Sequence, residues 1–278
     1  MEKSLKRMHP MGLLLYFSGN FLFAMWSRHP WMTGIQMVCL CSIYFYHEKS
    51  VRKLLPFFGI VFLAAVTNPL FVQRGITVLF YIGNLPVTME SFFYGLHYGC
   101  ILMNTLLLFS IFRRYFRQEH WVYLFGSIFP KLGVMFSMAM GLLPKYKKQT
   151  QLMLDTQKQF IEKSLFHRVM KVCSMETTWA FETSMDQLDS MNARGYGLKK
   201  RTHFHLFQFE KKDAVDIIEI LMLCMVNGYG YLKFYSDFYF YPMIVWNTFR
   251  IRDVFFVIFM AAQILLPFLW KEGSHVSD

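Results

Sequence analysis

Three polar residues recur every seven positions inside an apolar segment of this chain, namely Glu90, His97 and Asn104. A helix over residues 89–112 places them on one face, because seven residues complete nearly two helical turns. Ionisable groups within an apolar helix are candidates for moving protons or ions, and a histidine or glutamate is also a candidate general base. The same side chains can instead hydrogen-bond to neighbouring helices. We favour packing, because the sequence identifies no second catalytic group at a matching depth.

A second candidate is a charged tip, the segment Asp-Ser-Met-Asn-Ala-Arg-Gly-Tyr-Gly at residues 189–197. It predicts the end of an amphipathic helix over about 168–194, with Arg194 in the last turn and Gly195 just after it. A glycine there adopts the left-handed conformation at little cost. A cation also suits the negative end of the helix dipole, and a guanidinium offers a rigid fork of donors to a carboxylate on a partner.

The same predicted helix carries an apolar stripe at helical spacing, formed by Phe181, Met185 and Leu188. Such a stripe can pack on neighbouring helices in a bundle beside the membrane. It can also dock in the groove of a partner protein. The spacing fits both interpretations, and both stay open.

The composition indicates the class of protein to which these elements belong. The 278 residues are 55% hydrophobic and 19% aromatic, and only 17% are charged, against about 25% in soluble domains. Many aromatic residues suit lipid-facing surfaces and membrane interfaces. We therefore expect an all-α, polytopic membrane protein, and strands are not expected because an open sheet edge cannot lie in lipid.

The charge distribution predicts which part of the chain lies in the cytoplasm. The net charge is +11, and residues 113–213 hold 17 of the 29 Lys and Arg but 9 of the 18 Asp and Glu. An excess of Lys and Arg marks cytoplasmic segments. This explains the basic charge more simply than nucleic-acid binding does, so no nucleic-acid partner is expected.

The apolar runs predict about six transmembrane helices. The runs cover residues 11–26, 31–46, 54–69, 89–112, 121–143, 213–232 and 243–269. A crossing takes about 20 residues. If 121–143 also crossed, the basic segment 145–212 would lie outside, so we expect 121–143 to lie in the membrane plane on the cytoplasmic side. Both termini are then cytoplasmic.

The remaining segments follow from this topology. Residues 70–88 are predicted to be an external loop or a re-entrant piece, and Pro144 is predicted to start a cytoplasmic helix that runs to about Phe166. These assignments divide the chain into N-terminal transmembrane helices at 1–118, a cytoplasmic coupling-helix region at 119–212 and C-terminal transmembrane helices at 213–278.

Several kinds of chemistry are excluded by missing motifs. No glycine is followed by lysine, so no Walker A phosphate loop is present. Neither the zinc-protease pattern His-Glu-x-x-His nor the hydrolase pattern Gly-x-Ser-x-Gly occurs. The five cysteines are scattered, and His203 and His205 fit a loop at anionic headgroups better than a metal site. We therefore expect no enzymatic activity, no cofactor and no metal.

Three segments, in order, resemble one family. The segments are Thr67–Phe80 with its Asn-Pro-Leu-Phe core, Thr88–Gly95, and Met191–Gly197 followed by Lys200–Phe204. They are similar to motifs of the T components of energy-coupling-factor (ECF) transporters, the EcfT/CbiQ family. The last segment resembles the second of that family's two Ala-Arg-Gly coupling motifs.

The resemblance implies a non-catalytic membrane scaffold in the plasma membrane of a prokaryote. In this family, coupling helices join two ABC-type ATPase subunits to a small integral-membrane S component, which captures a vitamin or a metal ion. ATP binding and hydrolysis by the ATPases then drive uptake. By similarity, Ala193, Arg194 and Gly195 fill the groove of one ATPase.

The first coupling motif departs from the family pattern. Phe160 and Ile161 stand where arginine and glycine are expected, so Lys158 or Lys163 is predicted to serve instead, or the two ATPases are engaged unequally. Helix packing or contact with the S component is expected of four further residues, Asn68, Pro69, Gly95 and Gly99.

Two alternatives belong to other functional classes. One is an intramembrane enzyme with His97 or Glu90 as the base. The other is a stand-alone secondary transporter, which would be built from inverted repeats with broken helices. No convincing internal repeat is visible in the sequence.

Overall fold

The structure is a computed structural model that describes residues 8–27, 29–72, 75–82, 85–159, 165–197, 209–234, 238–245 and 251–269. It is mostly helical, as the composition predicts. The chain separates into two compact units: the first consists of residues 1–117 and 209–278, and the second of residues 118–208.

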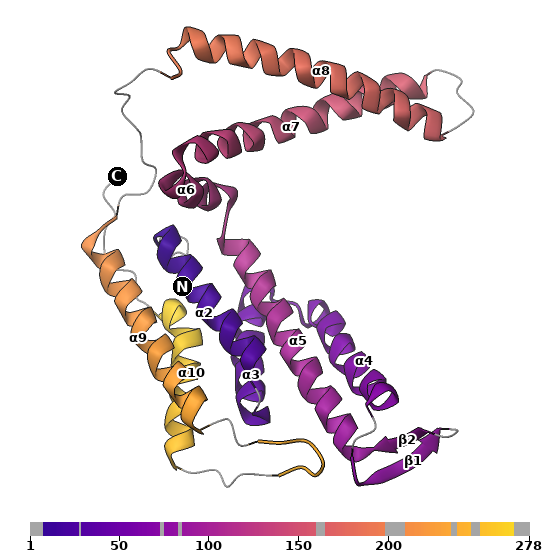
Figure 1. Cartoon of the computed structure of the whole chain (residues 1–278), viewed down its shortest axis with the longest axis vertical. Helices are drawn as coiled ribbons and strands as arrows, with labels where there is room; N and C mark the ends of the chain where they lie inside the picture. Colours follow the sequence, from indigo (N-terminus) through magenta and orange to yellow (C-terminus); the bar gives the residue numbers. More distant parts are fainter. Residues whose placement is uncertain are drawn as a thin grey trace. The chain divides into compact units, whose positions relative to one another are not determined.

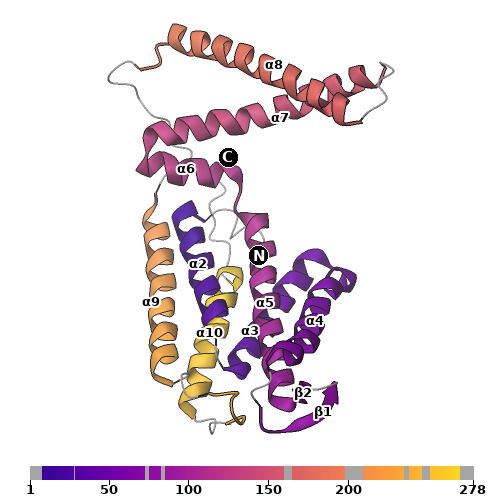
Figure 2. The same ribbon diagram turned by 45° about the vertical axis from the view of Figure 1, so that its right-hand side comes forward.

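In the described residues of the first unit, six long helices run side by side (Figures 1 and 2). They are α2 (Pro10–Trp26), α3 (Pro30–Glu48), α4 (Leu55–Phe71), α5 (Met89–Tyr115), α9 (Lys211–Phe234) and α10 (Ile251–Leu269), with the short helix η1 (Val51–Lys53) before α4. Helix α5 contacts α2, α3 and α4, while α9 packs against α2 and α10, and α10 packs against α3.

The core of this unit lies between α2, α5, α9 and α10. Leu13, Tyr16 and Met103 are almost fully buried there. The Tyr16 hydroxyl donates to the carbonyl oxygen of Ile264 at 2.7 Å, which links the first helix to the last. A buried side-chain hydrogen bond also joins α9 to α10. These bonds satisfy polar groups that would otherwise be costly to bury.

Helices α4 and α5 approach closely through two glycines. A Cβ added to Gly95 would lie 2.8 Å from the carbonyl oxygen of Ala64, and one added to Gly99 would lie 2.9 Å from the Cα of Val61. Small residues four apart let two helix backbones come together. Gly95 and Gly99 thus place α4 directly on α5.

A two-stranded antiparallel hairpin, β1 (Val78–Ile82) and β2 (Leu85–Thr88), connects α4 to α5. The expectation of no strands was wrong at this place. The segment 70–88 is not simply a loop, because the aromatic and β-branched residues of Val78–Ile82 and Leu85–Thr88 favour strands. The register pairs Val78 with Thr88 and Tyr81 with Pro86.

The second unit contains three helices in its described residues, α6 (Gln118–Ile128), α7 (Pro130–Lys158) and α8 (Leu165–Ala193). The single helix predicted over 121–143 is divided in two. Pro130 disfavours helical geometry in the residue before it, and Phe129 is extended, with φ −131° and ψ 90°. The prediction that Pro144 begins a helix ending near Phe166 was also wrong, because Pro144 lies inside α7 and Phe166 belongs to α8.

The C-terminal apolar run is shorter as a helix than the sequence suggested. Residues 238–245 are not helical, and a bridge pairs Tyr239 with Val245. Within the described residues, Met89–Tyr115 and Lys211–Lys233 are long and apolar enough to cross a membrane, while Leu55–Phe71 and Asp253–Leu265 are shorter apolar helices. Six crossings therefore stay a prediction.

Candidate functional site

The tip of α8 ends in a well-defined capping turn. The amide of Tyr196 donates to the carbonyl oxygen of Met191 at 3.0 Å, and the amide of Gly195 donates to that of Asn192 at 2.9 Å. Gly195 has a φ of 75°. This pair of bonds, closed by a left-handed glycine, is the Schellman motif. The predicted conformation of Gly195 is confirmed, and the turn leaves Arg194 at the cap position.

Arg194 is exposed at this tip, as is Ala193 beside it. The last carbonyl groups of α8 give the helix end a partial negative charge. A guanidinium held there by a closed turn has its donors available for a carboxylate or a carbonyl of another molecule. The tip is therefore built as a cationic projection.

The apolar stripe of α8 is exposed along its length. Phe181 is 71% exposed, Met185 66% and Leu188 49%. One of the two interpretations left open by the sequence was packing of this stripe on the other helices of the unit. In the described residues, the stripe is exposed instead. The contacts of α8 with α7 lie on its other face, where Trp179 meets the ring of Tyr146 at 5.2 Å between centroids.

Helices α7 and α8 pack as an antiparallel pair (Figures 1 and 2). Thr150 donates to the Glu176 carboxylate at 2.9 Å, and Gln157 lies 3.9 Å from the sulfur of Met175. Met175 precedes Arg194 by 19 residues, which corresponds to roughly 30 Å along the helix axis at 1.5 Å per residue. The end of α7 and the end of α8 are therefore well separated.

Lys158 is the last residue of α7. Its ammonium group forms an exposed ion pair with Asp155 at 2.9 Å, one helical turn earlier. Such a pair contributes little to stability, and it leaves Lys158 accessible at the helix end. Several predicted residues lie outside the described part of the chain, namely Lys163 and the segment 200–205 with His203 and His205.

The three polar residues on α5 are buried and bonded to other elements. The Glu90 carboxylate accepts a hydrogen bond from the backbone amide of Thr77 at 3.1 Å. This bond ties the start of α5 to the residue just before β1. The Asn104 amide donates to the carbonyl oxygen of Thr33 at 3.0 Å. Both residues act as links between segments of the first unit.

His97 is fixed from both sides of its ring. Its Nε2 lies 3.2 Å from the carbonyl oxygen of Ser27, and its Nδ1 lies 3.2 Å from the hydroxyl of Thr33. A carbonyl oxygen can only accept, so Nε2 donates to it. With both nitrogens engaged, His97 joins α5 to the connection between α2 and α3, and this geometry favours packing over a role as a general base.

The four residues assigned to packing or to S-component contact meet at one junction. The Asn68 amide donates to the carbonyl oxygen of Ser91 at 2.7 Å. Pro69 is buried near the end of α4, and Gly95 and Gly99 provide the close approach already described. The structure brings these residues together within the first unit, while contact with an S component stays a prediction.

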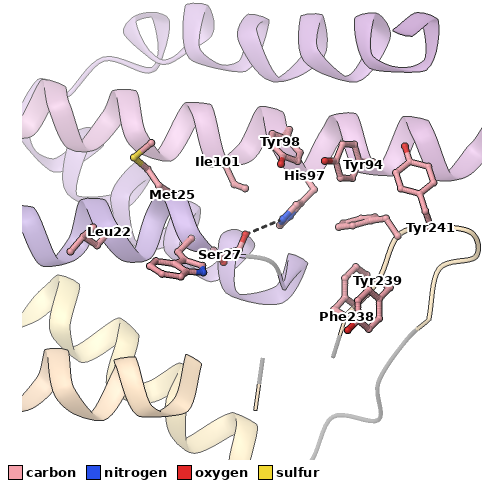
Figure 3. Close-up of a pocket in the computed structure, with 12 residues that line it drawn as sticks. Leu22, Met25, Ser27, Tyr94, His97, Tyr98, Ile101, Phe238, Tyr239 and Tyr241 are labelled. Carbon is pink, nitrogen blue, oxygen red and sulfur yellow. Dashed lines mark hydrogen bonds between the residues drawn. The ribbon is translucent and has the colours of Figure 1, made fainter. Parts of the chain in front are cut away.

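An aromatic cavity in the first unit was not predicted from the sequence. The cavity has a volume of about 510 Å³, within the ~300–1,000 Å³ range of small-molecule sites. Seven of its twelve lining residues are Trp, Tyr or Phe. Figure 3 shows Tyr94 and Tyr98 on α5 across from Phe238 and Tyr239. Its walls come from three distant segments, so no local pattern could have indicated it.

In the described ranges, no group of three or more His, Cys, Asp or Glu side chains is arranged to hold a metal ion. The expected absence of a metal and of a cofactor stays a prediction.

Comparison with known proteins gives no relative, since no family model and no curated protein matches this sequence significantly. The likeness to ECF T components therefore depends on the motif residues themselves.

Proposed function

We propose that this chain is the membrane scaffold that couples two partner ATPases to substrate uptake in an ECF-type importer. The observation that carries the proposal is the tip of α8, where a Schellman turn presents the exposed Arg194 at the end of an uncovered apolar stripe. The tip has the shape and chemistry of a helix end that docks in a partner's groove. Without a phosphate loop of its own, the chain depends on such partners for ATP hydrolysis.

A bilayer environment is supported by the outward-facing side chains of the first unit. Large apolar residues are exposed on its outer helices, including Phe62 at 72% on α4, Met225 at 75% on α9 and Ile251 at 88% on α10. Soluble monomers rarely expose apolar patches of this extent. Lipid is the solvent in which such a surface is stable, and the proposed location is the plasma membrane of a prokaryote.

Helix lengths support six crossings. Helices α2 and α4 each have 17 residues, and α3 and α10 each have 19. These lengths lie within the roughly 17–25 residues of a transmembrane helix, and α5 and α9 are longer. We assign α2, α3, α4, α5, α9 and α10 as the crossings.

Basic residues set the proposed orientation. Arg113 and Arg114 lie in the last turn of α5, and Lys211 and Lys212 begin α9. These helices flank the second unit in the chain, so cytoplasmic Lys and Arg place that unit inside. An even number of crossings then puts both termini in the cytoplasm.

Two helix ends are available for two ATPases. Arg194 marks the end of α8, and Lys158 marks the end of α7, roughly 30 Å away along the pair at 1.5 Å per residue. Antiparallel packing keeps the two ends apart, so each can enter a different ATPase subunit. The S component, which supplies the vitamin or metal ion, binds elsewhere on the membrane unit.

The test is co-purification of the tagged full chain with ABC-type ATPases encoded in the same genome, in mild detergent, with stoichiometry from quantitative mass spectrometry. Wild-type chain should retain two ATPase subunits. Arg194→Glu should reduce retention at least roughly tenfold, because a charge-assisted hydrogen bond contributes about 1.5–3 kcal/mol. Arg194→Lys should be intermediate, since it keeps the charge but loses the fork.

Glu182→Arg is the matched control, because it reverses an exposed charge on the same helix three turns before the tip. It should retain both ATPases at the wild-type level. The proposal fails if wild-type chain binds no ABC-type ATPase, or if Arg194→Glu keeps both of them at full occupancy.

A further inference from the structure

Helix α6 and the first half of α7 form a helical hairpin that is apolar on nearly all sides. Residues 132–143 contain no charged side chain. Large apolar residues of the connection and of α7 are exposed, at 56% for Phe129, 49% for Leu132 and 63% for Met135. A helix in water normally keeps a polar face, so this hairpin requires an apolar surrounding.

The two arms are closely packed against each other. A Cβ placed on Gly133 would collide with the Cα of Gly126, so the backbones touch at this point. The rings of Phe125 and Phe136 lie 5.9 Å apart across the same contact. The hairpin is therefore held together by its own contacts, and Phe129, Leu132 and Met135 stay exposed outside them.

The charge of the hairpin region is mostly positive. Glu119 lies in the first turn of α6, and the following residues 120–154 contain four lysines and no Asp or Glu. Three of the four, Lys145, Lys147 and Lys148, follow directly after the apolar arm, and all three are exposed. Positive charge beside an apolar surface complements a membrane whose headgroups are anionic.

We propose that the α6–α7 hairpin inserts into the anionic leaflet that faces the second unit, with Phe129 and Met135 among the acyl chains and the three lysines at the lipid phosphates. The expected depth is about 5–10 Å, as for other interfacial helices. This inference rests on the proposed function only in taking the chain as a membrane protein.

The consequence for coupling follows from the continuity of α7. The helix runs without interruption from Pro130 to Lys158. Its first half is the lipid-binding arm and its last residue is one of the two proposed ATPase contacts. Headgroup charge is therefore expected to bias the orientation of the coupling helices through one continuous helix.

The first measurement needs no substitution. The full chain is placed in nanodiscs of phosphatidylcholine alone or of phosphatidylcholine with phosphatidylglycerol, and amide hydrogen exchange is compared. Exchange in residues 118–148 should slow several-fold in the anionic discs, while exchange in α8 should not change. Equal exchange of 118–148 in the two lipids overturns the charge-dependent part of the proposal.

The second measurement locates the side chains. A spin label at position 129 or 135, in a chain whose native cysteines are replaced, reports accessibility to oxygen and to a water-soluble nickel complex. In the anionic discs, a label at either position should be more accessible to oxygen than to the nickel complex. A label at Glu182 on α8 should be more accessible to the nickel complex. If labels at both hairpin positions are more accessible to the nickel complex, the hairpin does not insert.

The third measurement tests the lysines. Lys145→Gln, Lys147→Gln and Lys148→Gln together should remove the difference between the two lipids, because each lysine near an anionic surface strengthens association roughly fivefold. Lys158→Gln, outside the hairpin, is the control and should keep the difference. A triple variant that still distinguishes the lipids contradicts the assignment. If the wild-type chain binds no ATPase, the proposed function fails, but the expected difference between the two lipids stays the same.

Discussion

Tyr196 and Met191 are joined across the end of α8 by a 3.0 Å hydrogen bond from amide to carbonyl oxygen. The bond closes only because Gly195 between them takes a left-handed conformation, with a φ of 75°. It directs the chain away from the helix axis and leaves Arg194 at the exposed corner. The geometry of the proposed coupling tip is thus a local property of six residues.

Gly195→Ala should weaken this tip. A Cβ in the left-handed region costs about 1–2 kcal/mol, so amides of residues 192–196 should exchange faster and ATPase retention should fall. Gly195→Asn should be milder, because asparagine tolerates this region better than other residues. Unchanged exchange in Gly195→Ala would show that the turn does not depend on glycine.

Gly99→Ala should separate α4 from α5. Its Cβ would meet the backbone of Val61 at 2.9 Å, and forcing extra volume into a packed contact costs about 1–3 kcal/mol. The measurement is the thermal unfolding midpoint in detergent. Gly59→Ala on α4 is the control, because nothing lies within 4 Å of its Cβ. Equal midpoints for the two variants would contradict the close approach.

Gly133→Ala should open the α6–α7 hairpin for the same reason, since its Cβ would meet the Gly126 backbone. Gly141→Ala lies on the same helix, and nothing surrounds its Cβ within 4 Å. Hydrogen exchange in α6 should rise in the first variant and not in the second. If both leave α6 protected, the two arms do not depend on this contact.

Lowering the pH should loosen the start of α2. Burial lowers the pKa of His9 below its ordinary 6.5, although Asp213 opposes this shift. The folded state then binds fewer protons than the unfolded state just below pH 6.5, so stability falls as pH drops through that window. His9 Nδ1 accepts from the amide of Met11 at 3.3 Å, and protonation there removes the acceptor.

His9→Asn separates this effect from others, because asparagine can cap the helix and does not titrate. The unfolding midpoint of the wild-type chain should fall more between pH 7 and pH 5 than that of the variant. Parallel pH profiles would show that His9 is not the group responsible.

A cysteine replacing Lys147 tests the orientation of the second unit. The residue is exposed, so labelling depends on which side of the membrane it occupies. A membrane-impermeant thiol reagent should not label it in intact cells and should label it after the membrane is opened. Labelling in intact cells would place the coupling helices outside and remove the basis of the proposed function.

Much of the local structure was predictable from the sequence. The end of α8, the left-handed glycine and the apolar runs depend on residues within a few positions of one another. Helix α8 begins at Leu165, three residues before the predicted start at Arg168. Helix boundaries set by proline were less predictable, since Pro130 begins α7 while Pro144 lies inside the same helix.

Only the tertiary structure decided which distant groups meet. His97 lies against Ser27, 70 residues earlier, and Gly99 lies against Val61. A spacing of seven residues places polar groups on one face of a helix but does not say which element covers that face. The aromatic cavity has walls from three segments, and the α6–α7 hairpin needs a contact between two glycines. The sequence determined the helices and the charged tip, because those depend on neighbouring residues. Packing between helices depends on which surfaces fit together, and this is settled only when the chain folds.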